Sequence, residues 1–394
     1  MASALVLFMT PGLAFFYGGL VRGKNVVSTV MYSFVAMGVV SVVWVLWGYS
    51  LAFGEGGPFI GNLNYLGFKG VSSTGTDIHG AGTPDMAVAI FQMMFAIITP
   101  ALITGAIAER FKFTTYLVFL VAWITFVYAP IAHWVWAGDG WLFEMGARDF
   151  AGGTVVHINA GIAAVVAAWM VGKRRGVDRG VEPHNVPFVI LGAGILWFGW
   201  FGFNAGSGLA ADGLAISAFL VTNVAAAMAL VVWVILGHIH TGKMSAVGAA
   251  TGAVAGLVAI TPASGFVGPM GAIAIGLGAG VLTFYAVRIR YKFGFDDALE
   301  VMAVHGIGGI WGALATGIFI VGGIGLLDGD AEALGYNAVA VLATIAYSFI
   351  VTFVILKILD VIPGLGLRAD EADEDAGLDI ALHGERAYVG DGAD

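Results

Sequence analysis

Eleven long apolar stretches divide this chain, and they constrain its fold more than any other feature. A helix rises about 1.5 Å per residue, so roughly 20 apolar residues cross the roughly 30 Å hydrocarbon core of a bilayer. Backbone polar groups in lipid must be bonded within the segment, which favours helices. We therefore predict an all-α integral membrane protein with eleven transmembrane helices. The predicted spans are residues 2–21, 26–53, 84–107, 113–134, 150–171, 186–206, 214–237, 245–263, 269–288, 299–321 and 336–359.

The composition excludes a soluble globular domain. Apolar residues make up 59% of the chain, charged residues make up only 11%, and the mean hydropathy is +0.92. The 60 glycines favour close helix packing in lipid, because small residues let helix backbones approach. Cysteine is absent, which excludes disulfides and thiolate metal sites.

The end of the chain differs in charge from the rest. Residues 369–394 contain nine acidic residues and one basic residue, so they carry −8 of the net charge of −9. An acidic segment of this kind is by default a solvated, partly disordered extension. We expect two parts, a transmembrane domain over residues 1–362 and a cytoplasmic regulatory tail over residues 363–394.

The lysines and arginines between the spans predict the orientation. If the N-terminus lies outside, fifteen of them fall on the inner side and two, Lys69 and Arg148, on the outer side. Cytoplasmic loops are enriched in positive residues, so this split predicts a multi-pass plasma-membrane protein with a cytoplasmic C-terminus. The first span begins almost at Met1, and we expect no cleavable signal before it. The inner set is Arg22, Lys24, Arg110, Lys112, Lys173, Arg174, Arg175, Arg179, Lys243, Arg288, Arg290, Lys292, Lys357, Arg368 and Arg386.

Two histidines occupy equivalent positions in a weak internal repeat. An aspartate precedes each histidine by eight residues and a glycine follows it by four, first at His157 and again at His305. The copies are five helices apart, and because five is odd they must cross the membrane in opposite directions. This pattern predicts inverted repeats, helices one to five and six to ten, followed by a long eleventh helix. Substrate sites of such repeats lie near the midplane, where we expect both histidines.

A pair of buried imidazoles suits a path for a small nitrogen base. An ionisable side chain at that depth is costly unless it faces a cavity or a partner. Neutral imidazoles each carry one donor and one acceptor, so they can share a hydrogen bond, bind ammonia in passing and relay a proton. Bare ammonium would lose its hydration in an apolar lumen, and potassium has no proton to release. Such a path would select by chemistry more than by size.

Two other interpretations of His157 and His305 remain open from the residues alone. They could be unrelated side chains that bond carbonyls of neighbouring helices. They could also be ligands in an intramembrane metalloenzyme, but two histidines without a third nearby ligand form a poor zinc or iron site. We therefore expect no metal, no cofactor and no enzymatic activity.

Seven motifs along the chain stand out as long and specific. They are PGLAFFYGGLVRGKN (11–25), FQMMFA (91–96), GAIAERFKF (105–113), DFAGGTVVHINAG (149–161), WFGFNAGS (200–207), ITPASG (260–265) and DDALEVMAVHGIGGIWG (296–312). In this order they resemble characteristic segments of the ammonium transporter (Amt/Mep/Rh) family, prokaryotic Amt type. The resemblance implies transport of ammonium or ammonia across the lipid bilayer by a homotrimer with one pore per subunit.

The resemblance also implies roles for aromatic residues. Phe95 and Phe203 match the phenylalanines that close the outer pore mouth, and Trp136 and Ser207 match a recruitment site that Phe95 completes. Ammonium over an indole face gains roughly 0.5–2 kcal/mol, which is weak enough for release. From the residues alone, such aromatic spacing is more typical of packing, and Trp136 could belong to an interfacial belt.

Five further residues are candidates for supporting roles. Asp149 and Asp297 begin their helices, so their carboxylates are expected to cap backbone N–H groups, although Asp149 could also bind the cation directly. Thr261 matches a family position near the outer face, but a hydroxyl bonded to its own helix explains it equally well. Phe91 and Trp200 each lie one helical turn before a phenylalanine of the gate.

The remaining polar residues are assigned ordinary positions. The other six histidines are expected to be solvated or interfacial, and Glu109 and Arg110 are expected to pair with each other or with a neighbour. Two GxxxG ladders, residues 248–256 and 308–312, predict close helix contacts rather than nucleotide loops, and we expect no nucleic acid partner. The six histidines are His79, His133, His184, His238, His240 and His383.

The tail segment GLDIALHGERAY (377–388) resembles the regulatory segment of the family. The resemblance implies docking against neighbouring pores and regulation by a trimeric PII-type nitrogen-signalling protein. Two functional alternatives remain open. One is an ammonium sensor of the same fold, which would normally carry an appended signalling domain, and the other is an electroneutral ammonia gas channel.

Overall fold

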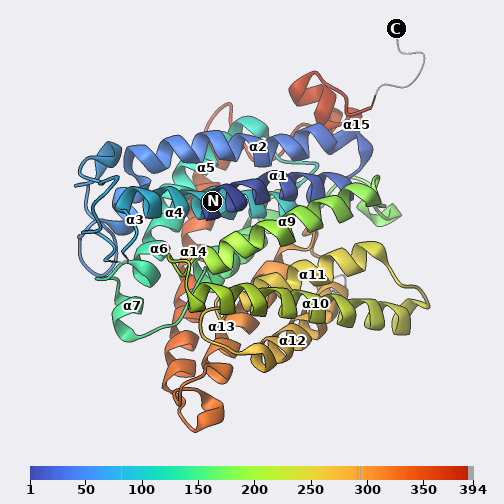
Figure 1. Ribbon diagram of the computed structural model, residues 1–394. Coiled ribbons are helices and arrows are strands. Elements are labelled where there is room, and N and C mark those ends of the chain that lie inside the picture. Colours follow the sequence, from blue (N-terminus) through green and yellow to red (C-terminus); the bar gives the residue numbers. More distant parts are fainter. Residues whose placement is uncertain (81, 291, 293, 389–394) are drawn as a thin grey trace.

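The computed structural model describes residues 1–80, 82–290, 292 and 294–388, so residues 389–394 of the predicted tail lie outside it. Within the described residues, ten helices are long and apolar enough to span a membrane, and α11 is apolar but shorter (Figure 1). The predicted all-α membrane fold is confirmed, and the spans agree to within a few residues. They are α1 (Ala2–Leu20), α2 (Val26–Val43) continued by α3 (Tyr49–Phe53), α4 (Asp85–Ile107), α5 (Phe113–Trp123) continued by α6 (Ala129–Trp136), α8 (Asn159–Val171), α9 (Val186–Gly206), α10 (Gly213–Thr241), α11 (Ala246–Ile260), α12 (Pro269–Arg290), α13 (Gly308–Phe319) and α14 (Glu332–Val361).

Several spans contain a π-helical turn, which the sequence did not reveal. The turn Gly153–Ile158 leads into α8 and carries His157, and the turn Met302–Ile307 leads into α13 and carries His305. A π turn widens the helix by one residue and is frequent at functional sites. Two further turns, Trp44–Gly48 and Ile124–Tyr128, join α2 to α3 and α5 to α6.

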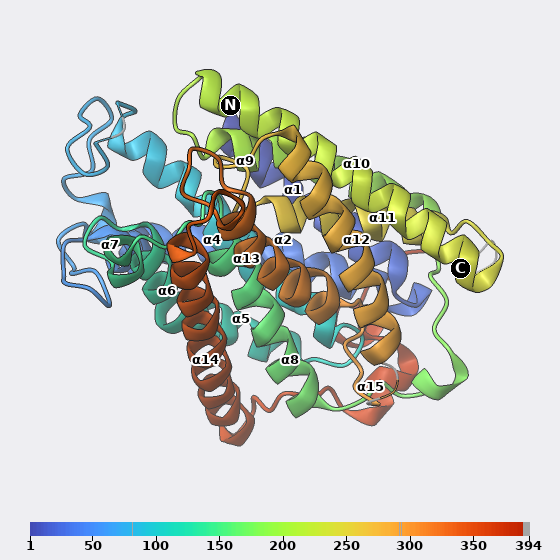
Figure 2. The same ribbon diagram turned by 90° about the horizontal axis from the view of Figure 1, so that it is seen from below.

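The first five spans and the next five pack in the same pairwise order. α1 contacts α2 and α4, α2 contacts α4 and α5, and α4 contacts α8. The corresponding pairs are α9 with α10 and α11, α10 with α11 and α12, and α11 with α13. The halves meet where α1 packs along α9 and where α8 and α13 contact each other's π turns. α14 lies outside this arrangement and packs on α5, α8 and α13 (Figure 2).

Glycines allow the two halves to approach closely beside the histidines. A Cβ at Gly161 would lie only 2.4 Å from the Cα and N atoms of Gly306. In the other half, a Cβ at Gly309 would lie 3.1 Å from the Cβ of His157. The two glycines that follow the repeated histidines therefore fill equivalent places against the opposite half.

The predicted glycine ladders also form helix contacts. Cβ atoms at Gly252 and Gly256 would approach α10 to 2.6 and 2.4 Å, and one at Gly312 would lie 2.2 Å from the carbonyl oxygen of Ala259. Such distances are too short for any larger side chain, so these positions bring α11 against α10 and α13 against α11.

The two ends of the bundle carry different structures. One end, the far side, carries the loop of residues 54–84 and α7 (Trp141–Met145). The opposite end, the tail side, carries α15 (Glu371–Ala376) (Figure 2). These names are used below for the two sides.

The described part of the tail is docked on the loops of its own chain. Lys24 Nζ donates to the carbonyl oxygens of residues 374 and 375, both at 2.7 Å, and the Asp379 carboxylate accepts from the backbone N–H of Ser28 at 2.8 Å. At the end of this segment, the Tyr388 hydroxyl lies 3.1 Å from His184 Nε2. Much of the described tail is solvent-exposed, as expected by default, but specific polar contacts anchor it to the helix ends and loops beneath it.

Two expectations for single polar residues are wrong. His133 is fully buried rather than interfacial, because the end of α3 and the loop after it cover the ring. Its nitrogens lie 3.0 Å from the oxygen of Ala52 in α3 and 2.6 Å from that of Gly57 in the loop. Glu109 pairs with Arg22 at 2.7 Å, as expected of a neighbour pair. Arg110 instead donates to backbone carbonyl oxygens.

Candidate functional site

His157 and His305 meet at the contact between the two halves. Their Nδ1 atoms are 3.2 Å apart, their ring centroids are 5.3 Å apart, and the side chains are buried. When both rings are neutral, one Nδ1 must donate and the other accept. His157 Nε2 is buried and has no hydrogen-bond partner among the described residues. A buried nitrogen without a partner can form a hydrogen bond with a small polar molecule.

An aspartate caps the π turn that carries each histidine. The Asp149 carboxylate accepts from the backbone N–H groups of residues 152–154, each at 2.7 Å, and from the Thr154 hydroxyl. Asp297 Oδ2 accepts from the backbone N–H of Met302 at 2.6 Å. These bonds satisfy donors that a helix start leaves free. The symmetric spacing of aspartate and histidine in the sequence thus corresponds to symmetric caps.

Aromatic rings separate His157 from the far side. Phe95 and Phe203 stack with centroids 4.1 Å apart and planes tilted by 32°. His157 lies 6.0 Å from the ring of Phe203 and 5.4 Å from that of Trp200, nearly parallel to both. Trp200 Nε1 donates to the Thr261 hydroxyl at 2.8 Å, and this hydroxyl donates to a carbonyl one turn back. Thr261 therefore orients the ring on which His157 stacks, a relation that the sequence did not show.

A cavity of about 380 Å³ opens on the far side of the phenylalanine pair. Trp136 meets Phe95 edge-on, with centroids 5.9 Å apart, and its Nε1 donates to the Asp149 carbonyl at 3.0 Å. The Ser207 hydroxyl donates to the Phe203 carbonyl at 2.8 Å, which leaves its oxygen lone pairs able to accept. The structure thus brings together the residues expected for recruitment.

Residues outside the expected set complete the walls of this far-side cavity. His79 comes from the loop before α4, and Gln92 comes from α4 itself. The sequence places His79 in an outer loop, and only the folding of that loop over the bundle brings it to the cavity. Phe91, expected beside the gate, lines the same cavity and meets Phe95 at 4.9 Å.

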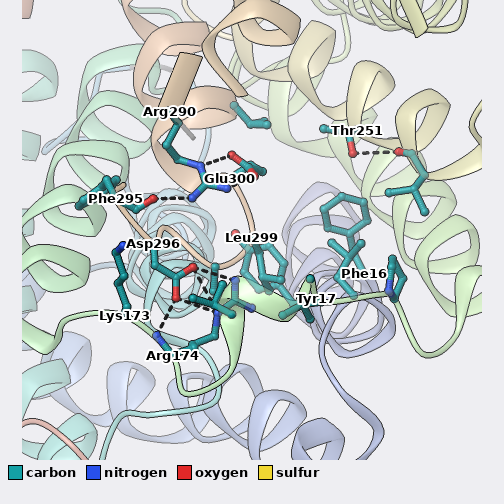
Figure 3. Close-up of a pocket in the computed structure, with 18 of the residues that line it drawn as sticks. Phe16, Tyr17, Lys173, Arg174, Thr251, Arg290, Phe295, Asp296, Leu299 and Glu300 are labelled. Atoms are coloured by element: carbon teal, nitrogen blue, oxygen red, sulfur yellow. Dashed lines mark hydrogen bonds and ion pairs between the residues drawn. The ribbon is translucent and has the colours of Figure 1, made fainter. Parts of the chain in front are cut away.

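A larger cavity of about 550 Å³ lies on the tail side and extends to His305. Figure 3 shows two ion pairs on its walls. Arg174 binds Asp296 with 2.8 Å between Nη2 and Oδ1, and Arg290 Nε donates to Glu300 at 2.8 Å. Burial opposes ionisation of Asp296, but the hydrogen bonds and charge of Arg174 lower its pKa to about 2. The walls of this tail-side cavity therefore carry paired charges.

The space beside the two histidines, between the two cavities, is narrow and apolar. The space beside His157 and His305 has a volume of about 10 Å³, which is about the room for one water-sized molecule. His305 lines both this space and the tail-side cavity. Over the described residues, no group of three or more His, Cys, Asp and Glu could hold a metal ion. The other lining residues are Met9, Leu13, Phe16, Ile98, Leu102, Val156, Leu196, Trp200, Phe203 and Val254.

Comparison with known proteins gives consistent matches over nearly the whole chain. The family profile described as Ammonium Transporter Family matches residues 1–388. The ammonium transporter of Bacillus subtilis (strain 168) is 49% identical over 391 residues, which cover 98% of this chain and 96% of that protein. Ammonium transporter Amt1 of Archaeoglobus fulgidus is 46% identical over 394 residues, covering 98% of this chain and 97% of that protein.

Solved structures match the fold as well. The crystal structure of Saccharomyces cerevisiae Mep2 has a TM-score of 0.89 at 36% identity, covering 94% of this chain and 88% of that chain. A structure titled Sensor Amt Protein has a TM-score of 0.89 at 33% identity, covering 97% of this chain and 96% of that chain.

Proposed function

Because the chain belongs to the ammonium transporter family, we propose that ammonium is recruited in the far-side cavity, releases its proton and crosses as ammonia past both histidines. Family membership establishes ammonium transport by a multi-pass membrane protein, and the proposal concerns the mechanism. The observation that supports it is the buried pair of His157 and His305, 3.2 Å apart, in a space of about 10 Å³ between two larger cavities.

Recruitment uses the wall formed by Trp136, Phe95 and Ser207. The aromatic faces attract a cation through their quadrupoles, and the Ser207 oxygen accepts one N–H bond. The Asp149 carboxylate accepts three backbone N–H bonds, so its part is to hold the wall rather than to bind the ion. Binding of this kind is weak, as conduction requires, because the ion must also leave.

Passage requires loss of charge. The space beside the histidines admits about one water-sized molecule, so ammonium would enter without its hydration shell, at a large cost. Ammonia is neutral and can donate to the free Nε2 of His157. The phenylalanine pair is the gate between the cavity that binds charged ammonium and the space that neutral ammonia crosses. The proton crosses separately along the imidazoles, which can each accept at one nitrogen and release at the other.

The far side is then the outer side and the tail side is the cytoplasm. The positive residues between the spans support this topology. We also propose that the assembly is a homotrimer and that the tail, residues 363–394, is a regulatory segment at which a PII-type protein acts. Contacts of the tail with Ser28, in the first turn of α2, and with His184, in the loop before α9, support a regulatory role, because they connect the tail to two membrane-spanning helices.

The mechanism is tested by currents on a solid-supported membrane after an ammonium jump, together with ammonia flux into the same vesicles. Current and flux are expected in the native protein, and both should fall sharply in Trp136→Leu and His157→Ala. Flux without current would reject the separate proton path and leave an electroneutral gas channel. Absence of both would favour a sensor of the same fold.

A further inference from the structure

A histidine outside the conduction path lines the far-side cavity. His79 shares this cavity with Trp136 and Phe95, although it belongs to the loop that precedes α4. Its Nε2 lies 2.9 Å from the hydroxyl of Tyr49, and its ring packs edge-on against Phe53 with centroids 5.2 Å apart. The ring is therefore held in a defined position on the cavity wall rather than exposed on a free loop.

One carboxylate whose charge favours protonation of the His79 ring, that of Asp85, is already bonded to backbone N–H groups. Asp85, at the start of α4, is buried, and its carboxylate accepts from backbone N–H groups of the His79 loop, including that of His79 at 3.3 Å. Tyr49, on which Tyr65 packs, contacts the His79 ring through its hydroxyl group. Asp149 lines the same cavity, but its carboxylate caps a π turn. Burial lowers the pKa of His79 below its ordinary value, with Asp85 opposing this effect, so the ring is neutral at neutral pH.

We propose that protonation of His79 weakens ammonium recruitment at acid pH, because it places a second positive charge in the cavity that must attract the ion. The inference rests on the proposed recruitment in this cavity. A neutral imidazole leaves the weak attraction by Trp136 and Ser207 intact. An imidazolium repels the ion across a partly enclosed cavity, where charges are screened less than in bulk water. Affinity should therefore fall as the pH drops below the ordinary histidine range, while the later steps are unaffected.

The test is the pH dependence of the apparent KM and kcat for ammonium uptake into vesicles, between pH 8 and pH 5. In the native protein, KM should rise several-fold below about pH 6, with a smaller change in kcat. His79→Gln keeps a hydrogen-bonding group beside Tyr49 but does not titrate, so its KM should stay constant. His79→Lys should show a raised KM at every pH. The matched control is Ser73→Lys, which adds the same charge at an exposed loop position that does not line the cavity.

An acid-dependent KM that persists in His79→Gln would overturn the inference. So would a native KM that does not change with pH. If His79→Gln fails to fold, Tyr49→Phe gives a second measurement, since it removes the hydrogen bond but retains the imidazole and should keep the acid-dependent rise. An unchanged KM in Trp136→Leu at pH 8 would instead reject recruitment in this cavity, and the two failures are thus distinguishable.

Discussion

The Nδ1 atoms of His157 and His305 lie 3.2 Å apart although 148 residues separate them in the chain. The contact depends on matched features of the two halves. Each histidine sits on a π turn, and the aspartate eight residues before the histidine caps that turn. The glycine four residues after each histidine packs against the opposite half. The pair is therefore a product of the repeat and not of either half alone.

Removing either imidazole should greatly reduce transport. In His157→Ala or His305→Ala, ammonia loses a hydrogen-bonding partner in an apolar passage, and a loss of about 1–3 kcal/mol lowers the rate roughly tenfold to a hundredfold. Ammonium-dependent current and flux in vesicles measure the effect. His238→Ala, at an exposed position on α10, is the control and should behave as the native protein. Native rates in both pore variants would contradict the proposed path.

Adding one methyl group at the contact between halves should destabilise the fold. The Cβ of Gly161→Ala would lie 2.4 Å from backbone atoms of Gly306, so the helices must separate, at a cost of roughly 1–3 kcal/mol. Thermal unfolding in detergent should show a midpoint several degrees lower. Gly194→Ala is the matched control on α9, since no atom lies within 4 Å of its added Cβ. Equal midpoints for the two variants would show that the close contact does not constrain the protein.

Substitutions of Asp149 should distinguish a cap from a cation site. Asp149→Ala leaves buried N–H groups without an acceptor, and each costs about 1–3 kcal/mol, so unfolding should occur at lower temperature. Asp149→Asn keeps a carbonyl acceptor but removes the charge. With a capping role, this variant should be intermediate in stability and near native in KM for ammonium. A large rise in KM without loss of stability would instead indicate direct binding of the ion.

The buried pair of Arg174 and Asp296 should make stability depend on acid. The Asp296 pKa is lowered from 3.8 to about 2, so the ionised form stabilises the fold, fully above about pH 4, and this contribution is lost as the pH falls through 3.8 toward 2. Asp296→Asn removes the nearer of two carboxylate partners of Arg174, which keeps Glu109 at 3.6 Å, and should cost about 1–3 kcal/mol near neutral pH. The gap in unfolding midpoint between the native protein and this variant should narrow as the solution is acidified.

A neighbouring pair provides the control for this prediction. Arg175 binds Asp375 at 2.9 Å at an exposed position, where ion pairs contribute about 0–1 kcal/mol. Asp375→Asn should therefore shift the unfolding midpoint little at any pH. A shift as large as that of Asp296→Asn would mean that burial does not account for the difference between the pairs.

Removing the tail should alter transport without preventing insertion. Residues 364–388 contact Lys24 and the first turn of α2 on the tail side, and among the described residues the last membrane span ends at Val361. We expect the truncated protein to reach the membrane and to show a changed flux or a changed response to a PII-type protein. Asp379→Ala, which removes the acceptor for the backbone N–H of Ser28 at the start of α2, should increase protease cleavage of the tail. Unchanged transport of the truncated protein, with and without such a partner, would argue against regulation.

Several residues show where prediction from sequence failed. His133 was expected at an interface, and Arg110 was expected in an ion pair. Their partners are backbone carbonyl oxygens of loops that fold back over the helix ends. Carbonyl positions depend on the path of the loop, and no residue type in the sequence encodes them. The same reason applies to His79, whose loop position gave no indication of the cavity.

The membrane fold, the family and the internal repeat could be predicted from the sequence, because apolar length, motif order and the spacing around His157 and His305 are properties of the linear chain. The contact between the two imidazoles, the orientation of Trp200 by Thr261 and the docking of the tail became visible only in the folded structure. These are contacts between segments far apart in the chain. Their distances are set by glycine-mediated packing and loop paths, which a periodic pattern of apolar residues does not specify.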